Sequence, residues 1–95
     1  MDATVHDEVA TIAQALRAYA HEKEVHEAST ALQSKLMGQV QGASQLSPLQ
    51  RQAVEEALLR VRAKLDAYDS EEADRQATIG KLAERISHLR AQMAR

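Results

Sequence analysis

The stretch GQVQGASQLSPLQ, residues 38–50, is where we expect the chain to turn between two helical parts. It contains two of the three glycines and two serines, a composition typical of a loop. It ends with the chemistry of a helix start. Ser47 can accept from free backbone N–H groups, Pro48 lacks an N–H that would have no partner there, and Gln50 stands where a capping box needs it. We therefore predict a loop over 38–47 and a helix from residue 48.

A regular pattern of apolar residues follows this stretch and reaches almost to the end of the sequence. Its spacing alternates between three and four residues, as one face of an α-helix requires, and predicts a helix over about 48–94. Two positions that are in phase with it hold charged residues. We call the whole set the seam: Val54, Leu58, Val61, Leu65, Tyr68, Glu72, Arg75, Ile79, Leu82, Ile86, Leu89 and Met93.

The charged part of the seam lies in DSEEADRQ, residues 69–76, and two structures are consistent with it. In the first, the helix is continuous, and Glu72 and Arg75 form an ion pair on the seam. In the second, the chain breaks near 69–72 and a third helix follows, with Asp69 as N-cap and Glu72 reaching back in a capping box. The acidic cluster suits a helix N-terminus, whereas the unbroken phase favours a continuous helix. A polar layer of this kind costs stability but helps to fix register and partner.

The segment before residue 38 predicts a helix over about 3–37, but the phase of its apolar residues changes along it. Leu32 lies about 180° around a straight helix from Val5. Either the two halves of this helix bury opposite faces, or the helix is interrupted near 20–24. The first set of apolar residues is Val5, Val9, Ile12, Leu16 and Tyr19, and the second is Val25, Ala28, Leu32, Leu36 and Val40.

The composition limits the chain to a small all-α fold. It has 95 residues, with one proline, three glycines, two tyrosines and neither Trp nor Phe. Turn formers and strand formers are therefore scarce, and helix formers are abundant. We predict a single helical domain over 1–95 that folds as a long antiparallel hairpin resembling a coiled coil. A third helix after a break near Asp69 is the alternative form of this fold.

Charge and composition argue against several classes of function. The net charge is −2, so nucleic-acid binding is not expected. The absence of cysteine fits a cytoplasmic protein. The N-terminal residues lack the basic and apolar regions of a signal peptide, and no stretch approaches the roughly 18 apolar residues of a membrane span. We therefore expect a cytoplasmic protein without a membrane segment.

The side chains that most often carry catalysis or bind metals do not form a recognisable motif. His21 and His26 are five residues apart, which places them about 140° apart around a helix. Glu22 and His26 are four apart and could share a metal, but they equally make an ordinary helix pair. The sequence contains no Glu-x-x-His motif and no Gly-x-Ser-x-Gly elbow. We predict no catalytic residue, no cofactor and no metal site.

Two stretches resemble a known family. The sequence ALRAYAHEKEVHEASTAL, residues 15–32, is similar to the opening of the small helical YlbF/YmcA-type bacterial regulators, and SQLSPLQRQAVEEALLRV, residues 44–61, stands where such proteins place a loop before a second long helix. Val25 stands where an aromatic residue is expected, and the chain is shorter. The resemblance implies an all-helical, non-enzymatic protein that acts in regulatory complexes influencing RNA turnover and development.

The seam is the feature from which we expect the function. Ile at 79 and 86 with Leu at 82 and 89 is the alternation that favours two-stranded parallel coiled coils, and it packs equally well on another helix of the same chain, which we favour. The sequence predicts a protein-interaction module, either an adaptor or regulator or an assembly subunit, that forms a homo-oligomer or binds another protein. The alternatives are a secretion- or phage-type chaperone for an apolar client helix and a metal-dependent helical enzyme.

Overall fold

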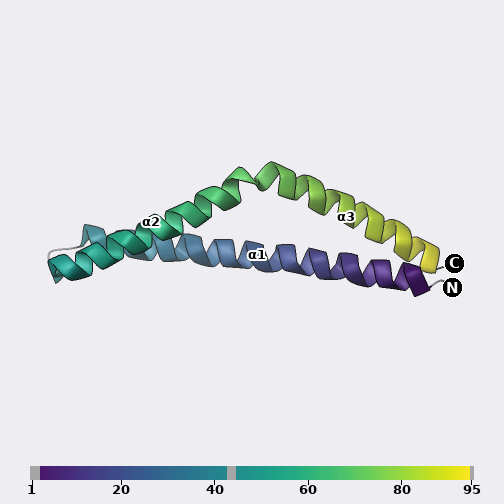
Figure 1. The fold of residues 1–95 in the computed structure, drawn as a ribbon, viewed down its shortest axis with the longest axis horizontal. Coiled ribbons are helices and arrows are strands. Elements are labelled where there is room, and N and C mark those ends of the chain that lie inside the picture. The colour runs from purple at the N-terminus through teal and green to yellow at the C-terminus, as the bar shows by residue number, and fades with distance from the viewer. Residues whose placement is uncertain (1–2, 43–44, 95) are drawn as a thin grey trace. The chain divides into compact units, whose positions relative to one another are not determined.

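The computed structural model describes residues 3–42 and 45–94 and places three α-helices in them. They are α1 (Ala3–Gln41), α2 (Pro48–Ser70) and α3 (Glu72–Met93), shown in Figure 1. The described residues contain no strand. The all-α prediction is therefore confirmed, and a third helix does follow a break near Asp69.

The first helix is continuous through the region where an interruption was one of two expectations. α1 shows no break near 20–24, and it runs to Gln41, so that its end overlaps the predicted loop. Gly38 lies inside the helix, where a glycine costs only about 1 kcal/mol relative to alanine. The N–H of Gly42 donates to the carbonyl of Gly38 at 3.0 Å and closes the last turn. The middle of the predicted loop, residues 43–44, lies outside the described residues.

The start of α2 has the predicted capping box. The Ser47 hydroxyl accepts from the N–H of Gln50 at 3.2 Å, and the Ser47 N–H donates to the Gln50 side-chain oxygen at 2.9 Å. Pro48 occupies the first helical position. Two backbone donors of the first turn are thus satisfied, which fixes where the helix begins.

The chain breaks between α2 and α3 at a single residue, Glu71, so of the two structures that the sequence allowed, the one with a break near 69–72 is observed and the continuous helix is not. Its backbone has φ −97° and ψ 3°, and its N–H donates to the carbonyl of Tyr68 at 3.3 Å. Asp69 lies in the last turn of α2 instead of capping α3. Because these dihedral angles stay close to the helical region, the apolar phase passes through the break.

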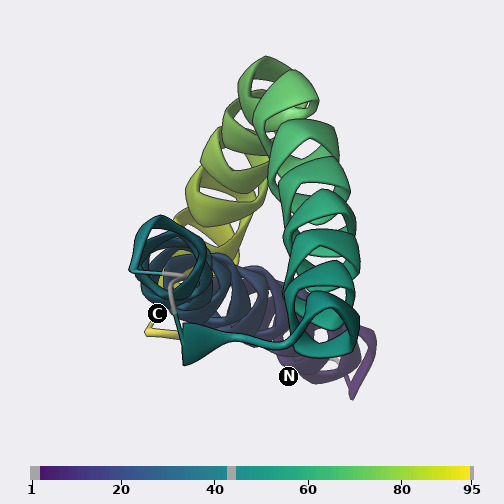
Figure 2. The ribbon, with the colours of Figure 1, turned by 90° about the vertical axis from the view of Figure 1, so that its left-hand side faces the viewer.

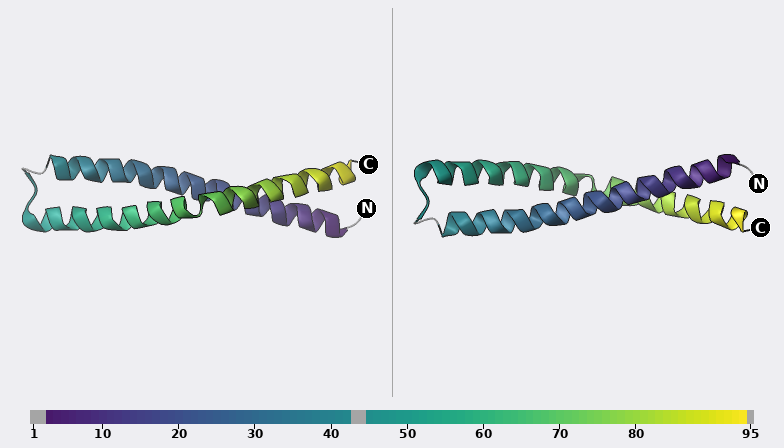
Figure 3. Two further views of the ribbon diagram at one scale, coloured as in Figure 1. Left: turned by 90° about the horizontal axis from the view of Figure 1, so that it is seen from above. Right: turned by 90° about the horizontal axis from the view of Figure 1, so that it is seen from below.

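The helices form two compact units, each built from two antiparallel helices. Unit 1 combines α1 up to Lys23 with α3, and unit 2 combines α1 from Glu24 with α2. In unit 1, the first turn of α1 and the last turn of α3 lie at the same end (Figure 1). In unit 2, α2 runs back beside α1 (Figure 3), and Figure 2 looks onto the end where α1 stops and α2 starts.

Unit 1 has a small aliphatic core and a charged clamp on its surface. Ile12, Ile86 and Leu89 are buried together, and the half-buried residues around them are Val5, Val9, Ala13, Leu16 and Leu82. Arg85 donates to both carboxylate oxygens of Glu8, with Nε–Oε1 at 2.7 Å and a second hydrogen bond of 3.2 Å. The two helices are thus held together by burial in the middle and by a bidentate pair at the edge.

Unit 2 explains the change of phase in α1, and the explanation differs from both expectations. The half-buried positions of α1 here are His26, Ser29, Gln33, Leu36 and Val40. They keep the spacing of three and four residues, but the first three of them are polar. Val25 and Leu32 are exposed. The helix therefore neither breaks nor buries its opposite face. Three of its five inward positions hold polar side chains, opposite an α2 that buries Val61 and Leu65.

The core of unit 1 can be tested with one substitution and a matched control. Leu89 is 1% exposed and Leu59 is 68% exposed. Leu89→Ala should lower the free energy of unfolding by about 2 to 5 kcal/mol, because it removes buried area and leaves a cavity. Leu59→Ala should change it by less than about 0.5 kcal/mol. Urea titrations followed by circular dichroism give both values. Equal effects of the two changes would contradict the assigned core.

The charged clamp of unit 1 predicts a pH dependence. The hydrogen bond from Arg85 holds the pKa of Glu8 below the ordinary value for a glutamate. Because the folded-state pKa is the lower one, the stabilisation is present above the unfolded-state pKa and is lost as pH falls through the folded-state pKa. An NMR titration of the Glu8 carboxyl should show this lowered pKa, and Arg85→Gln should return it toward the ordinary value. A Glu8 pKa that does not respond to Arg85→Gln would contradict the clamp.

Candidate functional site

The seam faces inward along both helices that carry it. Eleven of its twelve positions are buried or half-buried, and only Glu72 is exposed. In unit 1, its residues Leu82, Ile86 and Leu89 pack with the aliphatic residues at the start of α1. In unit 2, its residues Val61 and Leu65 are buried. Within this structure, the seam is thus engaged inside the chain, in line with the intrachain packing that the sequence favours.

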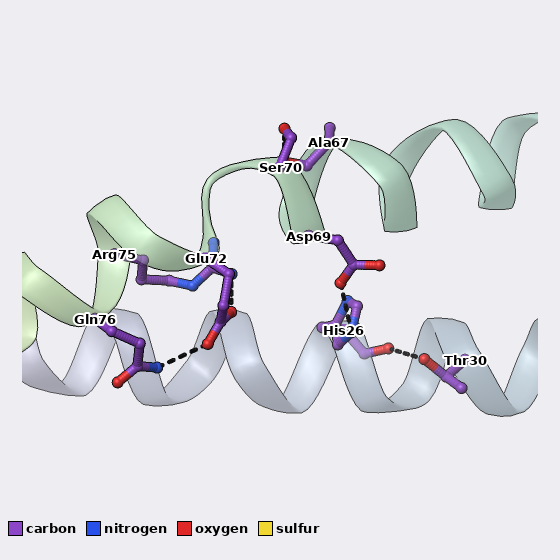
Figure 4. A network of polar contacts seen from close by, with 8 residues as sticks. All are labelled: His26, Thr30, Ala67, Asp69, Ser70, Glu72, Arg75 and Gln76. Carbon is purple, nitrogen blue, oxygen red and sulfur yellow. Dashed lines mark hydrogen bonds and ion pairs between the residues drawn. The ribbon is translucent and has the colours of Figure 1, made fainter.

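The polar layer of the seam is present in unit 1 (Figure 4). A guanidinium nitrogen of Arg75 forms an ion pair with Glu72, three residues earlier, and Arg75 is only 6% exposed. The other carboxylate oxygen of Glu72 accepts from the side-chain amide of Gln76 at 3.0 Å. A buried guanidinium needs such a partner, because removing a charge from water is costly unless it is paired and hydrogen-bonded.

A polar contact between the two helices of unit 2 is built around His26 of α1. Its ring stacks on Tyr68 of α2 with the centroids 4.0 Å apart and the planes 16° apart. Its Nε2 atom lies 3.7 Å from a carboxylate oxygen of Asp69, as Figure 4 shows. Its Nδ1 atom is buried and has no hydrogen-bond partner among the described residues. His26 thus lies beside an acid of the neighbouring helix. Asp69 makes this contact from the last turn of α2 and does not act as the N-cap of α3.

The histidines do not converge on a site with metal-binding ligands. Within residues 3–42 and 45–94, no three side chains of His, Cys, Asp or Glu gather in a way that could hold a metal ion. The contact of His26 involves a single carboxylate. With a protonated imidazole, the contact with Asp69 is an ion pair, while the ring stacks on Tyr68.

An open apolar groove lies on the surface of unit 2, beside the seam. It has a volume of about 330 Å³ and is lined by Gln33 and Met37 of α1 and by Glu55, Leu58, Leu59 and Arg62 of α2. Met37 is 43% exposed and Leu59 is 68% exposed. The groove is therefore lined by three apolar side chains, two of them largely accessible to water, together with an amide, an acid and a base.

The apolar pattern of the seam could not predict this groove. The residues that line the groove come from two helices, and all of them except Leu58 lie off the seam. Leu58 is in phase with the seam, and Leu59 is about 100° away from it around α2. The only local signal in the sequence is that Leu59 directly follows the in-phase Leu58, which indicates that apolar residues extend onto a second face of α2. The contribution of Met37 depends on how the two helices pair, which periodicity within one helix cannot show.

Other large apolar side chains are exposed without forming part of this groove. Val25 and Leu32 lie on α1, and Leu49, in the first turn of α2, is 78% exposed. Exposed apolar residues that stand singly are normal on protein surfaces. Leu49 is therefore the natural reference for Leu59, being the same residue type on the same helix outside the groove. None of the described helices has the combination of length and apolar content needed to span a bilayer.

The polar layer can be tested by removing its acid. Glu72→Ala should lower the free energy of unfolding by about 1 to 3 kcal/mol, because the buried Arg75 loses its carboxylate. Glu71→Ala, at the exposed neighbouring residue, should change it by less than about 0.5 kcal/mol. Replacing both Glu72 and Arg75 with leucine should be neutral or stabilising, because no charge remains buried. Urea unfolding measures all three. A double variant much less stable than Glu72→Ala would contradict this assignment.

Comparisons with known proteins do not add a family to this description. No protein-family model, no curated protein and no solved structure matches the chain. The features that bear on function are therefore those of the chain itself: an inward seam with one buried ion pair, a stacked histidine, and an apolar groove with a charged edge.

Proposed function

We propose that this chain is a non-enzymatic protein-interaction module, a small cytoplasmic adaptor or regulator or an assembly subunit, and that the groove of unit 2 is its docking surface. The observation that carries the proposal is the exposure of Leu59 and Met37 across one groove. A regulatory role of the kind that the YlbF/YmcA-type resemblance implies is compatible with it.

The physical reason is the gain from covering these side chains. Burying a leucine or methionine that is otherwise exposed contributes roughly 1.5 to 3 kcal/mol. Protein interfaces commonly combine an apolar centre with polar groups around it. The lining of the groove has both kinds of residue, with Leu58, Leu59 and Met37 beside Glu55 and Arg62. A groove between two helices also suits a third helix, which would place an apolar stripe along it.

The seam and the groove have different roles in this proposal. The seam holds each pair of helices together, so its side chains stabilise the surface that the partner contacts. The groove supplies the contact itself. A chaperone that covers an apolar helix of a client would use the same groove, and it is a special case of the proposed function.

The proposal predicts that one side chain controls partner binding. Leu59→Gln should weaken the capture of native-host partners by at least about tenfold, because it removes an apolar anchor from the groove. Leu49→Gln should leave capture unchanged, although Leu49 is the more exposed leucine. The measurement is quantitative affinity capture with mass spectrometry, with the helicity of both variants checked by circular dichroism.

The comparison of the two variants decides the outcome. Partners that are lost with Leu59→Gln and kept with Leu49→Gln identify the groove as the docking surface. If both variants retain the same partners at the same level, the groove does not mediate the interaction. If both lose them equally, general surface hydrophobicity explains the capture, and the proposal fails.

A further inference from the structure

We propose that the occupant of the groove is a second copy of this chain, bound so that α2 of one copy lies antiparallel to α2 of the other about a two-fold axis between Leu58 and Leu59. This inference rests on the proposed role of the groove as a docking surface. It goes further by naming the partner, the orientation and the charged pairs that would fix the register.

The side of α2 that borders the groove carries charges that alternate in sign about its centre. Arg51, Glu55, Arg62 and Asp66 follow one another there in the order base, acid, base, acid, and Asp69, which contacts His26, comes after them in the last turn. Together with the two leucines between them, they fall within about 100° around the helix, at 100° per residue. Glu55, Leu58, Leu59 and Arg62 all line the groove. One side of α2 thus has an apolar centre and charges at both ends.

An antiparallel pairing places opposite charges against each other. About an axis between residues 58 and 59, each residue faces the one that lies equally far beyond the axis in the other copy. Glu55 then faces Arg62 of the second copy, and Arg51 faces Asp66. Because the symmetry repeats each pair, four ion pairs of opposite sign flank the leucines. A parallel pairing in register would set each of these charges against its own kind, which is unfavourable.

The four charged side chains are accessible for these contacts. Arg51 and Glu55 have side chains 51% and 53% exposed, and they already pair with each other along the helix at 3.2 Å. Arg62 and Asp66 are exposed and form no ion pair with another residue in the described part of the chain. In the dimer, the Arg51–Glu55 pair of one copy would lie beside Arg62 and Asp66 of the other, giving a four-charge network at each end.

The centre of this interface would be apolar. Leu58 and Leu59 of one copy meet Leu59 and Leu58 of the other, and Met37 of α1 covers one flank in each copy. This arrangement leaves the charges at the rim, where they set orientation and exclude other registers, while the leucines supply most of the affinity. The same surface is thus complementary to itself, which is the requirement for a two-fold symmetric contact.

The test is a charge-reversal experiment with two single variants. Glu55→Arg sets a base against Arg62 of the second copy, and Arg62→Glu sets an acid against Glu55. Each variant alone should therefore associate at least about tenfold more weakly than the wild type. Mixed in equal amounts, the two variants should form a heterodimer, because both of its contacts between positions 55 and 62 then pair a base with an acid. Light scattering with size-exclusion chromatography over a dilution series measures the masses, and a tag on one variant identifies the heterodimer.

Two neighbouring residues provide matched controls. Glu56 and Arg60 lie on α2 outside the groove and pair with each other at 3.9 Å. Glu56→Arg and Arg60→Glu make the same charge changes, and both variants should dimerise like the wild type. Circular dichroism of all four variants shows whether the helices are retained. A loss of dimer in the controls equal to that in the two test variants would overturn the proposed register.

The outcomes separate this inference from the function on which it rests. Monomeric wild-type protein throughout the dilution series, or two variants that fail to complement each other on mixing while they remain helical, would overturn the second copy as the occupant. If Leu59→Gln nevertheless abolishes capture of a host protein, the groove still serves as a docking surface, for a different partner. Dimerisation that is unaffected by Leu59→Gln would place self-association elsewhere on the chain.

Discussion

The burial of an aliphatic seam against α1 is the constraint on which the rest of this structure depends. The chain has no Trp or Phe to close a thick core, so its leucines, isoleucines and valines leave water only if a second helix lies along them. In unit 1, this contact buries Ile12, Ile86 and Leu89. An uninterrupted α1 supplies one of the two helices in each unit. The formation of both units therefore depends on the continuity of α1 more than on how amphipathic either half of it is.

Polar residues at inward positions set the limits of this arrangement. Arg75 takes the place of an apolar residue in the seam, and it remains buried because Glu72 lies one turn away on the same helix. His26 takes an inward position of α1 and stacks on Tyr68. Both contacts are directional, unlike the apolar contacts that they replace. Polar groups at inward positions lower the stability gained by burying the helix interface, and they reduce the number of registers in which two helices can pair.

The structural features that could be predicted are those whose sequence signal lies within a few neighbouring residues or within one helix. The capping box at Ser47 depends on four consecutive residues, and the alternation from Val54 to Met93 depends on one helix, so both were predictable. The break near 69–72 was one of two alternatives, and the sequence could not decide between them, because neither glycine nor proline marks Glu71 and its dihedral angles preserve the phase. The inward face of α1 in unit 2 was misjudged, since a search for apolar residues follows Val25 and Leu32, which are exposed. The groove requires Met37 and Leu59 from two helices, which no single periodicity connects.

The shared helix has a consequence for the order in which the chain folds. The contact of His26 with Asp69 closes a loop through the short connection after α1, whereas Glu8 and Arg85 are 77 positions apart in the sequence. Loop closure costs more entropy as the loop grows, and folding is slower when contacts are distant. Once unit 2 has formed, the segment that separates Glu8 from Arg85 is largely ordered, so the remaining search is short. We therefore expect unit 2 to form first and unit 1 to close onto an α1 that is already helical.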